Sequence, residues 1–187
     1  MPLIECTLIK GYEKYTRQLL NERLTDAACS VIGAKSDFVI VTIKEVESEN
    51  YMRGRSIKTP AAAPKQADHI IRSFLTAMED RDLELAKTFL ADHFKMTFPG
   101  NTSLSTLEDL IAWAQTRYKF VKKDIEDISL SFNELITTGY CHGTLYGEWI
   151  DGKTFENIRF IDRFEITPDG ITKQDVWNDM ALYMPNA

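Results

Sequence analysis

Pro2 is the residue with the clearest capacity for proton chemistry without a cofactor. If Met1 is removed, which a small second residue favours, the chain begins with a secondary amine. An α-amino group titrates at roughly 7.7–8.0, and partial burial lowers that pKa because burial disfavours the cation. Pro2 is therefore a candidate general base for removing a proton next to a carbonyl group. The alternative is a proline without catalytic use. The residues that surround Pro2 have to decide between these two interpretations.

The segment that follows Pro2 has the pattern of a strand, a helix and a second strand. Apolar residues alternate over residues 2–9 and recur at helical spacing over residues 12–32. Gly33 then predicts the end of the helix. Residues 38–43 are β-branched and continuously apolar, which is typical of a buried parallel strand. Two parallel strands joined by a helix form a right-handed βαβ unit.

The predicted βαβ unit is too small to close a core by itself. Residues 50–55 add only a turn or a short hairpin, and the unit ends near residue 58. So short a domain rarely buries enough apolar area alone. We therefore expect its sheet to be covered by copies of the same chain, in a homo-oligomer such as a dimer, trimer or hexamer.

Residues 2–58 resemble the 4-oxalocrotonate tautomerase family. The resemblance rests on Pro2, the βαβ pattern, the run over residues 39–46 and residues 50–54. It implies short βαβ subunits in hexamers or related oligomers, with the amino-terminal proline as general base. It also implies a cofactor-independent keto–enol tautomerase, in which Tyr51 takes the place of an aromatic residue beside the proline.

The cations of the family are only partly present. Tyr12 and Ile40 stand where its best-known members carry arginines, which argues against a dicarboxylate substrate. Arg53 is the candidate to stabilise an enolate, and Arg17 and Arg55 are candidates to bind the substrate. The alternative for Arg53 and Arg55 is a solvated hairpin or salt bridges between subunits.

Residues 59–67 mark a change in composition. Two prolines surround an alanine run in the sequence Thr-Pro-Ala-Ala-Ala-Pro-Lys-Gln-Ala. Such a segment is typical of an extended linker. We therefore expect two domains, over residues 1–58 and 68–187.

The larger domain begins with helices and continues with strands. Its predicted helices cover residues 67–80, 83–90 and 107–118, the last opened by a capping box of Ser105 and Glu108. Its predicted strands cover residues 95–98, 125–136, 140–150, 154–166 and 171–180. This order predicts an α+β fold, in which three helices pack on one face of a curved antiparallel sheet, following the small βαβ unit.

Asp162 is the most informative carboxylate of the larger domain. It alternates with apolar residues on one strand face: Ile158, Phe160, Phe164 and Ile166. A carboxylate on an apolar face is costly unless it is paired or protonated, and such groups cluster at functional sites. Asp162 is therefore a candidate catalytic base, with a structural ion pair as the alternative.

Four further residues are candidates for the same chemistry. Trp177 and Asp179 share a face of the last strand with Asp175, so Asp179 is a second candidate base. His93 and His142 are candidates to bind the substrate or to donate a hydrogen bond to an enolate oxygen. Structural histidines are the alternative for both.

Residues 68–184 resemble the nuclear transport factor 2-like superfamily, and within it the SnoaL-like polyketide cyclase branch. The resemblance rests on the order of the elements and on five motifs: residues 98–100, Trp113, residues 117–118, 161–164 and 175–179. It implies a cone with a pocket, to which Trp113 would contribute. Members isomerise ketosteroids, cyclise or dehydrate polyketides, hydrolyse epoxides or only bind ligands. Phe98 stands near the position of the ketosteroid isomerase base.

Composition excludes several classes of partner. The net charge of the 187 residues is −6 and no basic block is present, so neither nucleic acid nor an anionic membrane is expected. No apolar run reaches the roughly 20 residues that span a bilayer. The three cysteines are odd in number and widely spaced, which is typical of reduced thiols in the cytoplasm. No zinc spacing or phosphate-binding glycine loop occurs, so no metal or cofactor is expected.

The sequence thus predicts a cytoplasmic, homo-oligomeric isomerase that acts on an enolisable carbonyl compound through Pro2. In this hypothesis the larger domain binds a small hydrophobic molecule. Two alternatives remain: cyclase, isomerase or dehydratase chemistry in the cone, or a larger domain that only binds ligand or promotes oligomerisation. An enclosed apolar pocket with Asp162 directed inward would favour chemistry in the cone.

Overall fold

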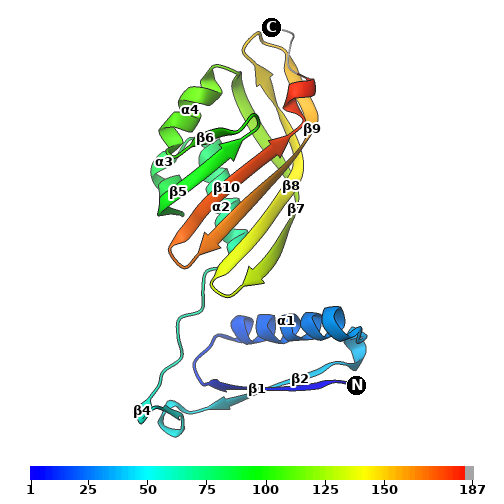
Figure 1. The fold of residues 1–187 in the computed structure, drawn as a ribbon, viewed down its shortest axis with the longest axis vertical. Helices are drawn as coiled ribbons and strands as arrows, with labels where there is room; N and C mark the ends of the chain where they lie inside the picture. The colour runs from blue at the N-terminus through cyan, green and yellow to red at the C-terminus, as the bar shows by residue number, and fades with distance from the viewer. Residues whose placement is uncertain (184–187) are drawn as a thin grey trace. The chain divides into compact units, whose positions relative to one another are not determined.

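A computed structural model describes residues 1–183 of the chain (Figure 1). The chain divides into two compact units, Met1–Pro64 and Lys65–Ala187, and the boundary lies inside the predicted linker. No helix within residues 1–183 combines the length and the apolar composition that crossing a membrane requires.

The first unit contains two parallel strands and one helix. Strand β1 (Leu3–Ile9) pairs with β2 (Ile40–Val46) in parallel register, and helix α1 (Lys14–Ile32) connects them along one face (Figure 1). Gly33 ends the helix in the left-handed conformation, at φ 67°, and its N–H donates to the carbonyl of Cys29 at 3.1 Å. The predicted β–α–β order and the role of Gly33 are confirmed.

Burial in the first unit differs from the prediction. Strand β2 begins at Ile40 because residues 36–38 form a 3₁₀ turn, and none of its residues is buried within the single chain. Indeed no residue of Met1–Pro64 is buried. One helix covers only one face of two strands, and the hairpin of β3 (Met52–Arg53) and β4 (Ser56–Ile57) is too short to cover more.

The second unit is a sheet with helices on one side. Within residues 65–183 the sheet has six strands in the order β6-β5-β10-β9-β8-β7. The strands are β5 (Leu90–Phe98), β6 (Thr102–Leu104), β7 (Tyr118–Asn133), β8 (Ile136–Trp149), β9 (Thr154–Thr167) and β10 (Gly170–Asn178). The helices are α2 (Ala67–Glu79), α3 (Leu83–Lys87) and α4 (Leu107–Gln115). The predicted α+β class is confirmed for this unit.

Three details of the second unit correct the prediction. The sheet is mixed, because β5 and β10 are parallel while the other neighbours are antiparallel. Strand β7 already begins at Tyr118, which the prediction placed in a helix. The residue that caps α4 is Thr106, whose hydroxyl accepts from the N–H of Asp109 at 3.1 Å, so the capping pair lies one residue beyond Ser105 and Glu108.

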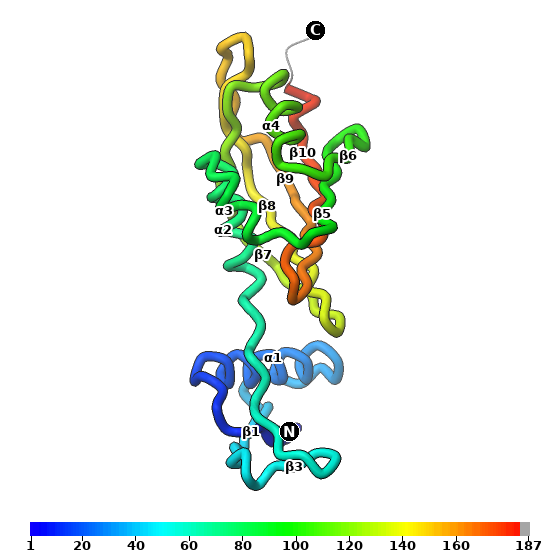
Figure 2. The backbone as a smooth tube through the Cα atoms, turned by 90° about the vertical axis from the view of Figure 1, so that its left-hand side faces the viewer, coloured from blue at the N-terminus to red at the C-terminus, as the bar shows by residue number. Residues whose placement is uncertain are grey.

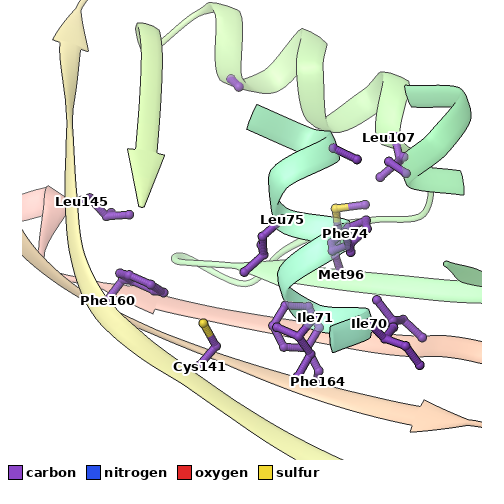
Figure 3. Packing of buried hydrophobic residues seen from close by; sticks show 14 of the residues in the cluster. Ile70, Ile71, Phe74, Leu75, Met96, Leu107, Cys141, Leu145, Phe160 and Phe164 are labelled. Carbon is purple, nitrogen blue, oxygen red and sulfur yellow. The ribbon is translucent and has the colours of Figure 1, made fainter. Parts of the chain in front are cut away.

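Helix α2 provides one wall of the core. Figure 3 shows Ile71, Phe74 and Leu75 directed from this helix toward side chains of the sheet. The ring of Phe74 packs edge-on against Phe94 and Phe164, each with a centroid separation of 6.3 Å. Full burial of one such side chain contributes about 1.5–3 kcal/mol, so this packing holds α2 against the sheet.

The long strands bend along their length (Figure 2). The register of β7 against β8 shifts between Ile125 and Asp127, as at a β-bulge, and bulges increase local twist and bending. Gly143 of β8 lies opposite this shift. A Cβ atom at Gly143 would lie only 2.0 Å from the carbonyl oxygen of Asp124, so only glycine lets the two strands approach here.

Replacing Gly143 should therefore destabilise the second unit. We expect Gly143→Ala to lower the free energy of unfolding by at least about 2 kcal/mol, because backbone rather than a flexible side chain must move. Chemical denaturation followed by tryptophan fluorescence measures this. Gly152→Ala is the matched control, because its added Cβ meets nothing closer than 3.7 Å and only the left-handed backbone opposes it. Equal losses in the two variants would contradict the role given to Gly143.

Candidate functional site

The second unit encloses a cavity of about 330 Å³ between its sheet and its helices. This volume lies at the lower end of the range usual for small-molecule sites. The lining is mostly aromatic and aliphatic and comes from both layers. It includes Met78, Phe98, Trp113, Trp149, Phe160 and Val176. The cavity thus suits an apolar molecule of modest size.

A buried ion pair lies at the wall of this cavity. Nζ of Lys123 donates to Oδ2 of Asp162, and Nε2 of Gln174 donates to the same oxygen at 2.9 Å. Asp162 is fully buried, whereas the side chain of Lys123 keeps 18% of its surface exposed. Lys123 and Gln174 line the cavity, and Asp162 lies behind them. Lys123 is therefore the charged group of this pair that a bound molecule can contact.

Three strands bring these groups together. Asp162 lies on β9 and Gln174 on the adjacent β10, whose Val176 pairs directly with Asp162. Lys123 lies on β7, and β8 separates it from β9. The long lysine side chain reaches across β8, and its Nζ lies 4.2 Å from the centroid of the Phe160 ring. The ring face and the carboxylate together fix the ammonium group.

One oxygen of the buried carboxylate has no partner. Among residues 1–183, Oδ1 of Asp162 accepts no hydrogen bond. A buried polar atom without a partner is costly, and in native proteins it marks strain or a functional site. The unpaired oxygen of Asp162 therefore indicates that this carboxylate serves a function and not stability alone.

Cys141 lies beside Asp162 in the core. It is fully buried on β8 and pairs directly with Asp162 on β9. Burial, as the main cause, raises the pKa of its thiol to about 11; the positive charge of Lys123 acts against this rise and the negative charge of Asp162 adds to it. Near neutral pH the thiol stays protonated, so Cys141 does not act as a nucleophile.

Glu79 places a carboxylate at the cavity. It lies at the end of α2 and lines the cavity, and its Oε1 accepts the backbone N–H of Lys123 at 2.8 Å. Strand β7 is an edge of the sheet, so this bond satisfies a donor that the sheet leaves open. The cavity wall therefore holds a carboxylate from α2 and an ammonium group from β7.

The predicted site residues of the second unit fall into two groups. Asp162 supports the cavity wall and Trp113 lines the cavity, as described above. His93 is exposed on β5, and Nε2 of His142 lies 3.8 Å from a carboxylate oxygen of Glu126, on the outer face of the sheet. Neither histidine lines the cavity.

Trp177 and Asp179 also lie away from the cavity. Trp177 pairs with Ile161 on the outer face and is 51% exposed. Asp179 follows β10, and its Oδ2 accepts from Nε of Arg159 at 2.7 Å. The alternation that groups these two residues is present, but their face is the outer one, because Gln174 and Val176 take the inner positions of β10.

The predicted residues of the first unit have the following surroundings. Pro2 is half-buried, and its carbonyl accepts the N–H of Ile40 at 3.0 Å. Arg17 donates to the carbonyl of Tyr12 at 2.6 Å and to Glu45 at 3.0 Å, so its guanidinium group ties α1 to β2. Tyr51, Arg53 and Arg55 are exposed in and beside the short hairpin.

Sequence reasoning missed Lys123, Gln174 and Glu79. Lys123 alternates with Val121 and Ile125, which pack against the core, so it carries the same signal as Asp162: a charge on an apolar strand face. The signal was hidden because the predicted strand began only at residue 125. Gln174 and Glu79 carry no such signal, since neutral amides and helix-end carboxylates are common on surfaces.

Comparisons with known proteins concern the fold. No protein-family model and no curated protein matches the sequence. A nuclear transport factor 2-like protein of unknown function from Burkholderia pseudomallei is similar in structure, with a TM-score of 0.53 and 15% identity, over 62% of this chain and 92% of that one. TerC, co-crystallised with polyporic acid, gives a TM-score of 0.52 and 12% identity, over 62% and 93%.

A third solved structure, from Jannaschia sp. CCS1, carries the name of a SnoaL-like polyketide cyclase. Its TM-score is 0.51 at 10% identity, over 67% of this chain and 94% of that one. The second unit therefore has the nuclear transport factor 2-like fold, a cone that closes on a cavity. Sequence identities this low show only a shared fold, so the function has to be argued from the cavity.

Proposed function

We propose that the cavity of the second unit binds a hydrophobic ketone and catalyses proton transfer next to its carbonyl group. The observation that carries this proposal is the Lys123 ammonium group, which Asp162 and Gln174 hold at the wall of a mostly apolar cavity. A fixed donor in a site of low dielectric stabilises a developing oxyanion far better than water does. The proposal corresponds to the cone hypothesis, with Lys123 rather than a histidine as the donor and with Glu79 rather than Asp162 or Asp179 as the base.

The reaction needs one base and one oxyanion donor. Glu79 accepts the proton from the carbon beside the carbonyl, and the electron pair of the broken C–H bond forms the carbon–carbon double bond of an enolate. The negative charge collects on the oxygen, where Lys123 donates a hydrogen bond. Return of the proton from Glu79 to another carbon of the conjugated system gives the isomer, so neither an oxidant nor a cofactor is consumed.

Asp162 and Gln174 are positioning residues in this scheme. Asp162 does not line the cavity and acts through Lys123, while Gln174 lines the cavity and donates to the same oxygen of Asp162. They hold the ammonium group in one orientation at the cavity wall. The aromatic lining excludes water, which strengthens the interaction between Lys123 and an enolate oxygen.

The neighbouring structures support this class of ligand. One carries the name of a SnoaL-like polyketide cyclase, and TerC was crystallised with polyporic acid. An enolate that attacks a second carbonyl of the same molecule closes a ring, so cyclisation follows from the same first step as isomerisation. We therefore propose an isomerase or cyclase of a hydrophobic ketone.

A second candidate activity is proton transfer by Pro2 in the first unit. It is supported by the parallel βαβ arrangement, in which Pro2 precedes β1 and its carbonyl joins β1 to the start of β2. With Met1 in place, the nitrogen of Pro2 belongs to a peptide bond and cannot act as a base. Loss of Met1 in the cytoplasm, the location expected from the reduced cysteines, is therefore a condition of this activity.

The first unit is also proposed to bind a second copy of itself. None of its residues is buried, although several large apolar side chains occur on it: Leu3, Val31, Ile32, Phe38, Ile40, Met52 and Ile57. A unit of this size without a buried core does not offset its conformational entropy. Contact with the same unit of another chain supplies the missing core.

Variants of the cavity wall test the proposed ketone chemistry. The probe is 2-tetralone, an apolar ketone whose α-proton exchange in D₂O is followed by NMR. We expect Lys123→Met and Glu79→Gln each to lower the catalysed exchange rate by about 100-fold or more, as removal of an oxyanion donor or a general base does. Asp162→Asn should lower kcat while KM changes little, because Asp162 positions Lys123 without contacting the ketone.

Two controls accompany this experiment. Lys95→Met removes an exposed lysine of β5 that does not line the cavity, and it should leave the exchange rate unchanged. The double variant Lys123→Met/Asp162→Leu removes both charges together, so it should fold without a stranded carboxylate while remaining inactive. Exchange at the wild-type rate in the folded double variant would overturn the proposal.

The candidate role of Pro2 is tested separately. Mass spectrometry of the intact protein shows whether Met1 is removed, and enol–keto conversion of phenylpyruvate is then compared between wild type and Pro2→Ala. We expect the wild type without Met1 to be active and Pro2→Ala to lose about 100-fold, the usual contribution of a general base. A retained Met1, or an equal rate in Pro2→Ala, argues against catalysis by Pro2.

The self-association of the first unit predicts a concentration-dependent mass. Light scattering coupled to size exclusion should give a dimer or a larger closed oligomer for the full chain. Ile40→Glu, which places a charge at the exposed start of β2, should shift the mass toward the monomer. Lys35→Glu in the neighbouring exposed segment is the control for charge alone, and a monomeric wild type contradicts the proposal.

A further inference from the structure

The cavity of the second unit has an excess of positive charge that proton transfer does not require. Among the described residues that line it, one is acidic, Glu79. The basic residues of the lining are Arg81, Arg117, Lys119, Lys122 and Lys123. The chain as a whole has a net charge of −6, so this concentration of cations is a local feature.

Two of these cations have partners and two arginines do not. Lys119 pairs with Glu148, and Lys123 pairs with Asp162. Within residues 1–183, neither Arg81 nor Arg117 has a carboxylate at salt-bridge distance. Both are therefore free to bind an anion that enters from outside.

Arg117 is held in a fixed orientation. Its guanidinium carbon lies 4.2 Å from the centroid of the Trp113 ring, and that ring packs against Phe98 at 5.0 Å. Stacking on the ring face engages the plane of the guanidinium group and leaves its N–H edge available. Arg117 thus presents a ready donor at the cavity.

Arg81 lies in the turn that follows α2 and is fixed by its backbone. It has a positive φ of 62°, and its N–H donates to the carbonyl of Met78 at 3.3 Å. A left-handed conformation is uncommon for a residue with a side chain, and such residues cluster at functional sites. The turn between α2 and α3 therefore holds Arg81 at the cavity.

Tyr118 links the two arginines. It is a buried residue at the start of β7 and lines the cavity. Burial, as the main cause, raises the pKa of its hydroxyl, and the positive charges of Arg81 and Arg117 act against that rise. Both charges are thus close enough to act on Tyr118, whose protonated hydroxyl adds a neutral donor to the same cavity.

We infer that the cavity selects an elongated apolar molecule with one acidic group, whose anion binds between Arg81 and Arg117 beside the hydroxyl of Tyr118. The apolar body then extends along β7 toward Lys123. Tyr118 and Lys123 are five residues apart on this strand, which corresponds to about 15 Å. The chemistry at the end of the molecule near Lys123 rests on the proposed function. The anion site depends only on the two arginines.

A pair of probes that differ only in charge tests the anion site. 6-Phenylhexanoate and 6-phenylhexanamide have the same length and apolar body, and their affinities are measured by calorimetry with the full-length chain at pH 7. We expect the carboxylate to bind about tenfold or more tightly than the amide, as charge-assisted hydrogen bonds to arginine predict. Added salt should weaken only the carboxylate.

Three variants test whether the two arginines cause the preference for the carboxylate. Arg81→Gln and Arg117→Gln should each weaken the carboxylate about tenfold and leave the amide within about twofold, since only the charged contact is lost. Arg72→Gln removes an exposed arginine of α2 that does not line the cavity, and it should change neither affinity. Equal binding of the two probes, no measurable binding of either, or an equal effect of Arg72→Gln would overturn the inference.

The outcome is independent of the proposed catalysis. The same titrations with Lys123→Met/Asp162→Leu should retain the preference for the carboxylate, because both arginines remain. A preference for the carboxylate without ketone exchange would refute the catalysis and keep the anion site. Exchange of 2-tetralone without any preference would refute the anion site alone.

Discussion

The ion pair between Lys123 and Asp162 is the interaction on which the arrangement of the second unit depends. Removing a carboxylate and an ammonium group from water is costly, and only close contact with further hydrogen bonds compensates for it. Asp162 reaches this condition on one oxygen, through Lys123 and Gln174, and leaves the other without a partner. An apolar pair of similar size would satisfy the core at least as well. The retained charge is therefore best explained by what Lys123 does at the cavity.

The bend of the sheet makes this contact possible. Lys123 and Asp162 lie on strands that are not neighbours, so β8 must allow the lysine side chain to pass over it. The register shift in β7 and the missing side chain of Gly143 let β7 and β8 approach closely where the sheet curves. The same curvature separates the sheet from α2 and α4, which leaves the cavity. Backbone geometry, core packing and site are thus consequences of one local feature.

The sequence predicts the face of a strand more reliably than the neighbours of that strand. The alternation around Asp162 correctly placed it among buried apolar residues, because side chains of a strand point to opposite faces at a period of two residues. The same rule grouped Trp177 with Asp179 but could not tell the inner face from the outer one. Pairing of β5 with β10 joins segments about 80 residues apart in the chain, and no local pattern encodes such a contact. Lys123 was missed for a related reason, since its role appears only when three strands and a bulge are assembled.

In the proposed reaction, the hydrogen bond between Glu79 and the backbone of Lys123 couples the edge of the sheet to the protonation of Glu79. A carboxylate is a stronger acceptor than a carboxylic acid, so this bond is tightest before any proton has been abstracted. Once Glu79 carries the proton, the attachment of α2 to β7 weakens. The wall of the cone is then loosest at the intermediate, and recovers when the proton leaves with the product. The bond between Glu79 and Lys123 thus marks the enolate, and not the product, as the state in which the cone is least firmly closed.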